Sequence, residues 1–119
     1  MSTTSNCTEV ESAIQFLLGL GARPINATQY IASFSIGAAR QLAIEKEKKS
    51  IYLWTQACRE SAPPELACFL RRHYSASKSR NSNLNEKNAP LLKAGNAADY
   101  WMFPTIGELV RFVHWYRKP

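Results

Sequence analysis

The sequence is short of acidic residues, and it lacks them most where its basic residues gather. It has a formal net charge of +6 and a single aspartate, Asp99. Between residues 70 and 95, Glu86 alone stands against a set of cations: Arg71, Arg72, Lys78, Arg80, Lys87 and Lys93. The rest of the chain is close to balanced. Charge concentrated in one segment attracts polyanions better than the same charge spread evenly.

The sequence also lacks the close ligand pairs that structural zinc requires. Structural zinc is usually held by four ligands that include short pairs such as C-x-x-C. Cys58, Cys68 and His73 are the nearest approach to such a set, and they are widely spaced. We therefore expect two thiols and an imidazole with structural roles, no bound metal and no cofactor.

No catalytic constellation is visible. The chain has two histidines, His73 and His114, but no triad, carboxylate pair or phosphate-binding loop. Gly19 and Gly21 are spaced as in a dinucleotide-binding turn, yet no strand is expected before them. The sequence thus predicts a protein that is not an enzyme and has no catalytic residues.

Long apolar runs and a secretory leader are missing too. The longest uninterrupted apolar stretches are a few residues, far short of the roughly 20 residues that span a bilayer. No basic segment followed by an apolar one stands at the N-terminus. Three cysteines without framework spacing favour reduced thiols. We expect an intracellular protein, cytoplasmic or nuclear, that does not contact membranes.

Apolar periodicity predicts an all-α protein. No segment alternates convincingly with a period of two, whereas several show helical spacing. We expect one domain over residues 1–119, a compact bundle of four or five helices. Residues 1–6 should be frayed, and residues 75–98, rich in serine and asparagine, should form a long polar basic loop before the last helix.

Four patterns support the helices. Gly19 and Gly21 should end a first helix that begins at a capping box formed by Thr8 and Glu11. Ile44, Ile51 and Cys58 recur every seven residues and predict a helix from about Ala38 to Arg59.

In that helix, Glu45 should pair with Lys49 on the exposed face. Pro63 and Pro64 should start the next helix, because proline suits a first helical turn. A second capping box, Thr105 with Glu108, predicts a last helix that runs to Tyr116.

The basic segment is the strongest indication of function, and it predicts nucleic-acid binding, to DNA or RNA. Lysine and arginine contact phosphates, and short polar side chains between them also reach phosphate oxygens. Tyr74 could stack on an unpaired base. The expected contacts are Arg71, Arg72, Tyr74, Lys78, Arg80, Lys87 and Lys93. Arg40 and Gln41 are weaker candidates, as base readers at the start of a helix-turn-helix recognition helix.

The aromatic C-terminal segment supports an alternative function. Large aromatic side chains anchor protein interfaces. If several are exposed, the chain is a helical interaction or assembly subunit, oligomeric or viral, that docks a second copy or another protein. The candidate docking residues are Trp101, Phe112, Trp115 and Tyr116.

Overall fold

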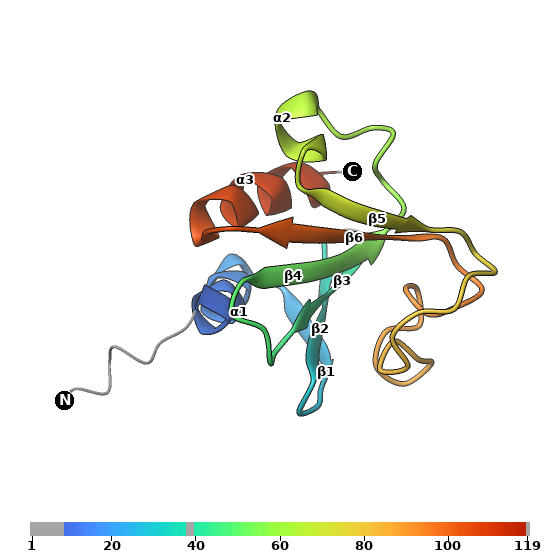
Figure 1. Cartoon of the computed structure of the whole chain (residues 1–119). Helices are drawn as coiled ribbons and strands as arrows, with labels where there is room; N and C mark the ends of the chain where they lie inside the picture. The colour runs from blue at the N-terminus through green and yellow to red at the C-terminus, as the bar shows by residue number, and fades with distance from the viewer. Residues whose placement is uncertain (1–8, 38–39, 119) are drawn as a thin grey trace.

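The computed structural model describes residues 9–37 and 40–118 and contains a six-stranded antiparallel sheet with three helices (Figure 1). The order across the sheet is β1-β2-β3-β4-β6-β5. The strands are β1 (Arg23–Ala27), β2 (Ile31–Ile36), β3 (Arg40–Glu45), β4 (Ile51–Gln56), β5 (Leu70–Tyr74) and β6 (Ala98–Phe103). The expected all-α bundle of four or five helices is therefore wrong.

The prediction of helices was wrong mainly for β2, β3 and β4, which are buried on both faces of the sheet. Their burial leaves almost no polar position to mark an alternation, as is usual for strands covered on both sides. Ile44 and Ile51 recur at helical spacing, but they belong to adjacent strands and join the same core cluster. Residues 38–39, at the start of the expected helix, lie outside the described residues.

The charged segment between β3 and β4 is a turn, and it is not the exposed face of a helix. Glu45, expected to pair with Lys49 in solvent, is only 7% exposed. Its carboxylate accepts hydrogen bonds from Trp54 Nε1 at 3.0 Å and from the Tyr100 hydroxyl at 2.7 Å. Lys48 Nζ lies 4.0 Å from it. The sequence could not show that hydrogen bonds from Trp54 and Tyr100 would hold the Glu45 carboxylate in the interior.

The helical ends were predicted better than the centre of the chain. Helix α1 (Glu9–Leu20) ends before Gly21, whose φ of 96° only glycine adopts easily. Helix α2 (Pro64–Ala67) begins at the second proline. Helix α3 (Ile106–Tyr116) follows the expected capping box, in which the Thr105 N–H donates to Glu108 Oε1 at 2.9 Å. Residues 1–6 and Thr8 lie outside the described residues.

The main core lies between one face of the sheet and helices α1 and α3. Val10, Ala13 and Leu17 of α1 and Leu109, Phe112 and Val113 of α3 pack in one cluster with apolar side chains of β2, β3, β4 and β6. We call this side of the sheet the helix face. The large aromatic residues of the C-terminal segment supply much of its volume.

The opposite side, which we call the loop face, is partly covered by residues 75–97, the segment between β5 and β6 (Figure 1). Leu84, Ala89 and Leu92 pack there against Ile31, Ala43, Trp54 and Ala98. The polar loop expected at 75–98 therefore has a small apolar core of its own. It leads into β6, and the last helix follows only after that strand.

Candidate nucleic-acid interface

A row of four aromatic rings lies on the loop face, beside and partly under residues 75–97. Strand pairing aligns Trp54 of β4 with Tyr100 of β6, and their rings lie 4.4 Å apart. Tyr52 stacks on Tyr100 at 5.6 Å, and Tyr74 of β5 lies 4.9 Å from Trp54. We call these four residues the aromatic strip. Trp54 is buried, and the three tyrosines are half-buried.

Cations lie against both ends of the aromatic strip. The Lys48 ammonium sits 5.6 Å from the centre of the Tyr52 ring, and the Arg72 guanidinium sits 5.2 Å from that of Tyr74. These are cation–π distances, and both side chains are exposed. The four rings pack against one another in the middle, and positive charge lies at either side.

Glu45 holds the centre of the aromatic strip in place. It accepts the Trp54 and Tyr100 hydrogen bonds described above, and Asn81 Nδ2 of the covering loop approaches it at 3.4 Å. Burial raises the pKa of the Tyr100 hydroxyl, and the hydrogen bond to the Glu45 carboxylate raises it further. Tyr100 therefore stays a neutral donor, and its ring is fixed on the sheet.

The expected phosphate contacts divide into two groups. Arg80 is engaged inside the protein: its guanidinium donates to the carbonyl oxygens of Ser75, Lys78, Leu92 and Asn96 at 2.7–3.1 Å. It also lies over the Tyr74 ring. Lys93 Nζ is 3.5 Å from Glu86.

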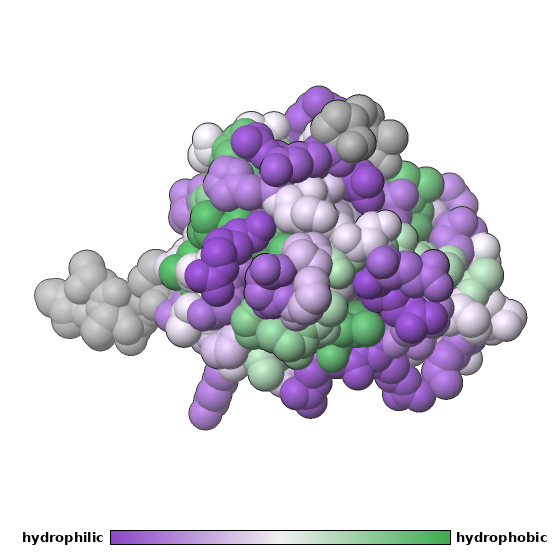
Figure 2. Space-filling model, turned by 90° about the horizontal axis from the view of Figure 1, so that it is seen from above, coloured by the Kyte–Doolittle hydropathy of each residue, from purple (hydrophilic) through white to green (hydrophobic). Residues whose placement is uncertain are grey.

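The second group keeps its charge at the surface. Arg71 and Arg72 of the edge strand β5 are exposed, as are Lys78 and Lys87 of the covering loop. Seen from the side on which α2 and β5 lie, the surface is largely hydrophilic, with small hydrophobic patches between (Figure 2). Of the expected phosphate contacts, these four cations are the ones whose side chains are exposed.

Arg40 and Gln41 are not on a recognition helix. They begin strand β3, so the expected helix-turn-helix is wrong. The Arg40 guanidinium lies 5.1 Å from the centre of the Tyr116 ring. Gln41 Oε1 accepts the Leu91 N–H at 2.9 Å. Both side chains are half-buried and contribute to internal contacts.

The candidate docking residues of the C-terminal segment lie mainly in the core. Trp101 and Phe112 are 0% exposed and Tyr116 is 1% exposed. The Tyr116 hydroxyl donates to the Gln41 carbonyl at 2.6 Å. Trp115 is half-buried and packs on Phe112 at 5.6 Å. Docking through this segment stays a prediction that depends on Trp115.

A second candidate site lies on the helix-face side of the same edge strand, around His73. Its Nδ1 is 2.6 Å from Oδ1 of Asp99, which has 0% exposure. The other carboxylate oxygen, Oδ2, accepts the backbone N–H groups of Cys58 and Arg59 at 3.0 and 2.8 Å. A carboxylate only accepts, so Nδ1 carries the proton and the ring is oriented.

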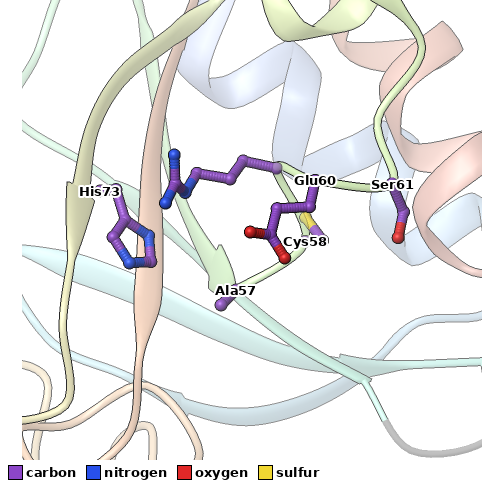
Figure 3. A pocket seen from close by; sticks show the side chains of 6 residues that line it. Ala57, Cys58, Glu60, Ser61 and His73 are labelled. Atoms are coloured by element: carbon purple, nitrogen blue, oxygen red, sulfur yellow. The ribbon is translucent and has the colours of Figure 1, made fainter.

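The His73 ring borders a pocket of about 240 Å³ lined also by residues 57–61 (Figure 3). Figure 3 shows Glu60 and His73, from two different elements, turned toward the same space. Sequence inspection missed this site because residues 58, 73 and 99 are far apart in the chain. The single aspartate of the sequence was the one available signal.

Cys58 borders this pocket as a protonated thiol. Burial raises its pKa to about 11, although the hydrogen bond with Thr55 opposes the rise. At neutral pH it is a poor nucleophile, because the thiolate is the reactive form. Among the described residues, no three or more His, Cys, Asp or Glu side chains are grouped as metal ligands.

Comparison of the chain with protein-family models, with curated proteins and with solved structures gave no match. In the part of the chain that the structure describes, none of the helices is long and apolar enough to cross a bilayer. The function must therefore be argued from the geometry of the surface and of the His73 pocket.

Proposed function

We propose that the protein is a small, non-enzymatic nucleic-acid-binding protein that acts inside the cell. A single strand would lie across the open part of the loop face, over β4, β6 and β5. The intracellular placement is supported by Cys58 and Cys68, which are both free thiols in the structure. The proposal does not depend on a helix-turn-helix.

The observation that carries the proposal is the aromatic strip with a cation at each end. Unpaired bases stack on aromatic side chains regardless of sequence, and each stacked base contributes on the order of 1–3 kcal/mol. Tyr52, Tyr74 and Tyr100 are each half-buried and keep part of their surface accessible. Bases inside a duplex cannot reach a flat sheet surface in this way, so the strip favours single strands.

The exposed cations supply the phosphate contacts. Arg72 extends from the same face as Tyr74, and Arg71 is its neighbour on the edge strand. Lys78 belongs to the part of the covering loop that follows that strand. Lys87 belongs to the part that lies over β1 and β2, where Ser33 Oγ donates to the neighbouring Asn88 carbonyl. If Arg71, Arg72, Lys78 and Lys87 each neutralise one phosphate of a single strand, the log–log dependence of affinity on salt has a slope of about −3. Arg80 and Lys93 are left out because internal partners hold them.

The test is a titration of labelled single- and double-stranded DNA and RNA at two salt concentrations. The test variant changes Arg71, Arg72, Lys78 and Lys87 to glutamine. The matched control changes Arg23, Arg111, Arg117 and Lys118, which are exposed and lie outside the basic segment, so that the net charge is the same. We expect micromolar or tighter binding of single strands by the control at low salt and at least a tenfold loss in the test variant.

A second variant isolates the aromatic strip. Tyr52→Ala removes the ring nearest Lys48 without touching the charge of the protein, and we expect a loss of about fivefold to a hundredfold for single strands. Equal binding by the test and control variants, together with no effect of Tyr52→Ala, would rule the proposal out.

A further inference from the structure

The pocket beside His73 is placed where a strand lying on the aromatic strip would turn over the edge of the sheet. His73 stands between Arg72 and Tyr74 in β5, and successive side chains of a strand point to opposite faces. Tyr74 belongs to the aromatic strip and Arg72 borders it, while His73 faces the pocket on the other side. No strand lies outside β5 in the described sheet, so nothing in it separates the two surfaces.

The pocket combines donors and acceptors, which an anion site would not. Arg59 provides a guanidinium, Glu60 a carboxylate and Ser61 a hydroxyl, and all three residues are exposed. The opposite charges of Arg59 and Glu60 cancel, so the pocket does not attract a phosphate strongly. It suits a neutral, flat group with hydrogen-bonding edges. Its volume of about 240 Å³ is below the range of roughly 300–1,000 Å³ that is usual for drug-sized ligands.

The loop that carries Arg59, Glu60 and Ser61 is held in place by hydrogen bonds from its backbone. Asp99 accepts the backbone N–H groups of Cys58 and Arg59, and it also orients the His73 ring. His73 Nε2 makes no hydrogen bond to any residue that the structure describes. A buried carboxylate that fixes both walls of an open pocket is a preorganising feature, because less freedom is lost when a ligand binds.

We propose that this pocket binds one unstacked guanine base of the nucleic acid, an inference that rests on the proposed function. Guanine presents two neighbouring N–H donors, N1 and the N2 amino group, to the two oxygens of a carboxylate such as Glu60. It presents two neighbouring acceptors, O6 and N7, to the guanidinium fork of Arg59. No other standard base offers both pairs. Cys58, held as a thiol, lines the pocket without reacting.

The first experiment measures the preference for guanine as a ratio of affinities. Wild-type protein is titrated with a labelled octamer of uridine and with the same octamer carrying one central guanosine. One bidentate contact discriminates by about 1–3 kcal/mol, so we expect the guanosine octamer to bind roughly 5- to 150-fold more tightly. Inosine, which lacks the N2 amino group, should lose part of that preference.

Glu60→Gln is the diagnostic variant, and Glu65→Gln of α2 is its matched control, because both remove one exposed negative charge. Both changes should raise the affinity for the uridine octamer slightly. Only Glu60→Gln should bring the guanosine-to-uridine ratio close to one. A ratio near one in the wild type, or an equal ratio in the two variants, would overturn the guanine pocket.

A second measurement separates failure of the pocket from failure of the proposed function. Guanosine monophosphate should shift the NMR signals of the His73 imidazole, and uridine monophosphate should leave them unchanged. If octamers bind without preference and neither nucleotide shifts His73, the pocket is refuted and the aromatic strip stands. If the octamers do not bind but guanosine monophosphate shifts His73, the proposed function is refuted and the pocket stands. If neither octamers nor nucleotides bind, both are refuted.

Discussion

The two faces of the sheet are built on different physical principles. The helix face is covered by α1 and α3 through apolar packing, with the rings of Trp101, Phe103 and Phe112 within 6.5 Å of one another. The loop face is covered by residues 75–97, which rely on a few apolar side chains and many hydrogen bonds. Apolar burial dominates stability, so the helix face should determine folding and the loop face should be free to carry function.

The largest expected effect comes from the helix face. Phe112→Ala removes a fully buried ring from the centre of the core, and such changes cost about 3–5 kcal/mol. Denaturant unfolding of the wild type and the variant measures the loss. Trp115→Ala on the same helix, where the ring is only half-buried, is the control and should cost clearly less. Similar losses in the two variants would contradict the assignment of the core.

Asp99→Asn should have the next largest effect, because the buried Asp99 carboxylate joins the loop after β4 to the edge strand β5. The substitution keeps the size of the side chain but weakens three hydrogen bonds to a buried charge, those from His73, Cys58 and Arg59. We expect a loss of about 2–3 kcal/mol in the free energy of unfolding. His73→Gln, which removes one of the three, serves as the comparison.

In thermal unfolding, Asp99→Asn should melt well below His73→Gln. If the Asp99→Asn variant melted within a degree of the wild type, Asp99 would not hold the pocket loop in place.

Arg80→Lys should weaken the loop face alone. Lysine keeps the charge but cannot reproduce the guanidinium fork that donates to four carbonyl groups. A loss of about 1–2 kcal/mol is expected, and it should be local. Hydrogen exchange should show faster exchange of amides in residues 75–97 and unchanged protection in α3. Loss of protection throughout the protein would instead show that the two faces unfold as one unit.

The smallest effect on stability is expected for Cys58, whose thiol should be unreactive at neutral pH. In a Cys7→Ser/Cys68→Ser background, its reaction with a disulfide reagent should stay slow below pH 9. A pKa of about 11 in place of 9.0 leaves about 100-fold less thiolate there. Because folding raises this pKa, its contribution to stability is present below pH 9 and is lost as the pH rises through 11.

The control for Cys58 is the same protein unfolded in urea, which should react at the rate of a free thiol. Fast reaction of the folded protein at pH 8 would show that the thiol is accessible and not held by its surroundings.

How much could be predicted depended on how local the determining interactions were. The capping box of Thr105 and Glu108 lies within one turn, and the prediction of α3 is confirmed almost to the residue. The end of α1 at Gly21 and the start of α2 at Pro64 follow from backbone preferences of single residues, and both are confirmed. Such signals do not depend on what packs against them.

The central strands were misread because their signal is not local. In "IASFSI" and "IYLWTQ" the β-branched and aromatic residues favour a strand, but apolar residues on both sides removed the alternation. The candidate phosphate contacts also differ in whether their surroundings could be predicted from the local sequence. The exposure of Arg71 and Arg72 could be expected from their charge, whereas the internal role of Arg80 depends on carbonyl groups that only the folded loop brings together.

The amino-acid sequence by itself determined the end of α1, the starts of α2 and α3, and that positive charge gathers in one segment, because these properties belong to single residues and their nearest neighbours. The tertiary structure alone decided which of those charges reach the surface, which four rings share one sheet face, and that the single aspartate fixes His73 beside a pocket. The physical reason is that strand pairing and burial join residues tens of positions apart, and only that pairing gives each side chain its partner.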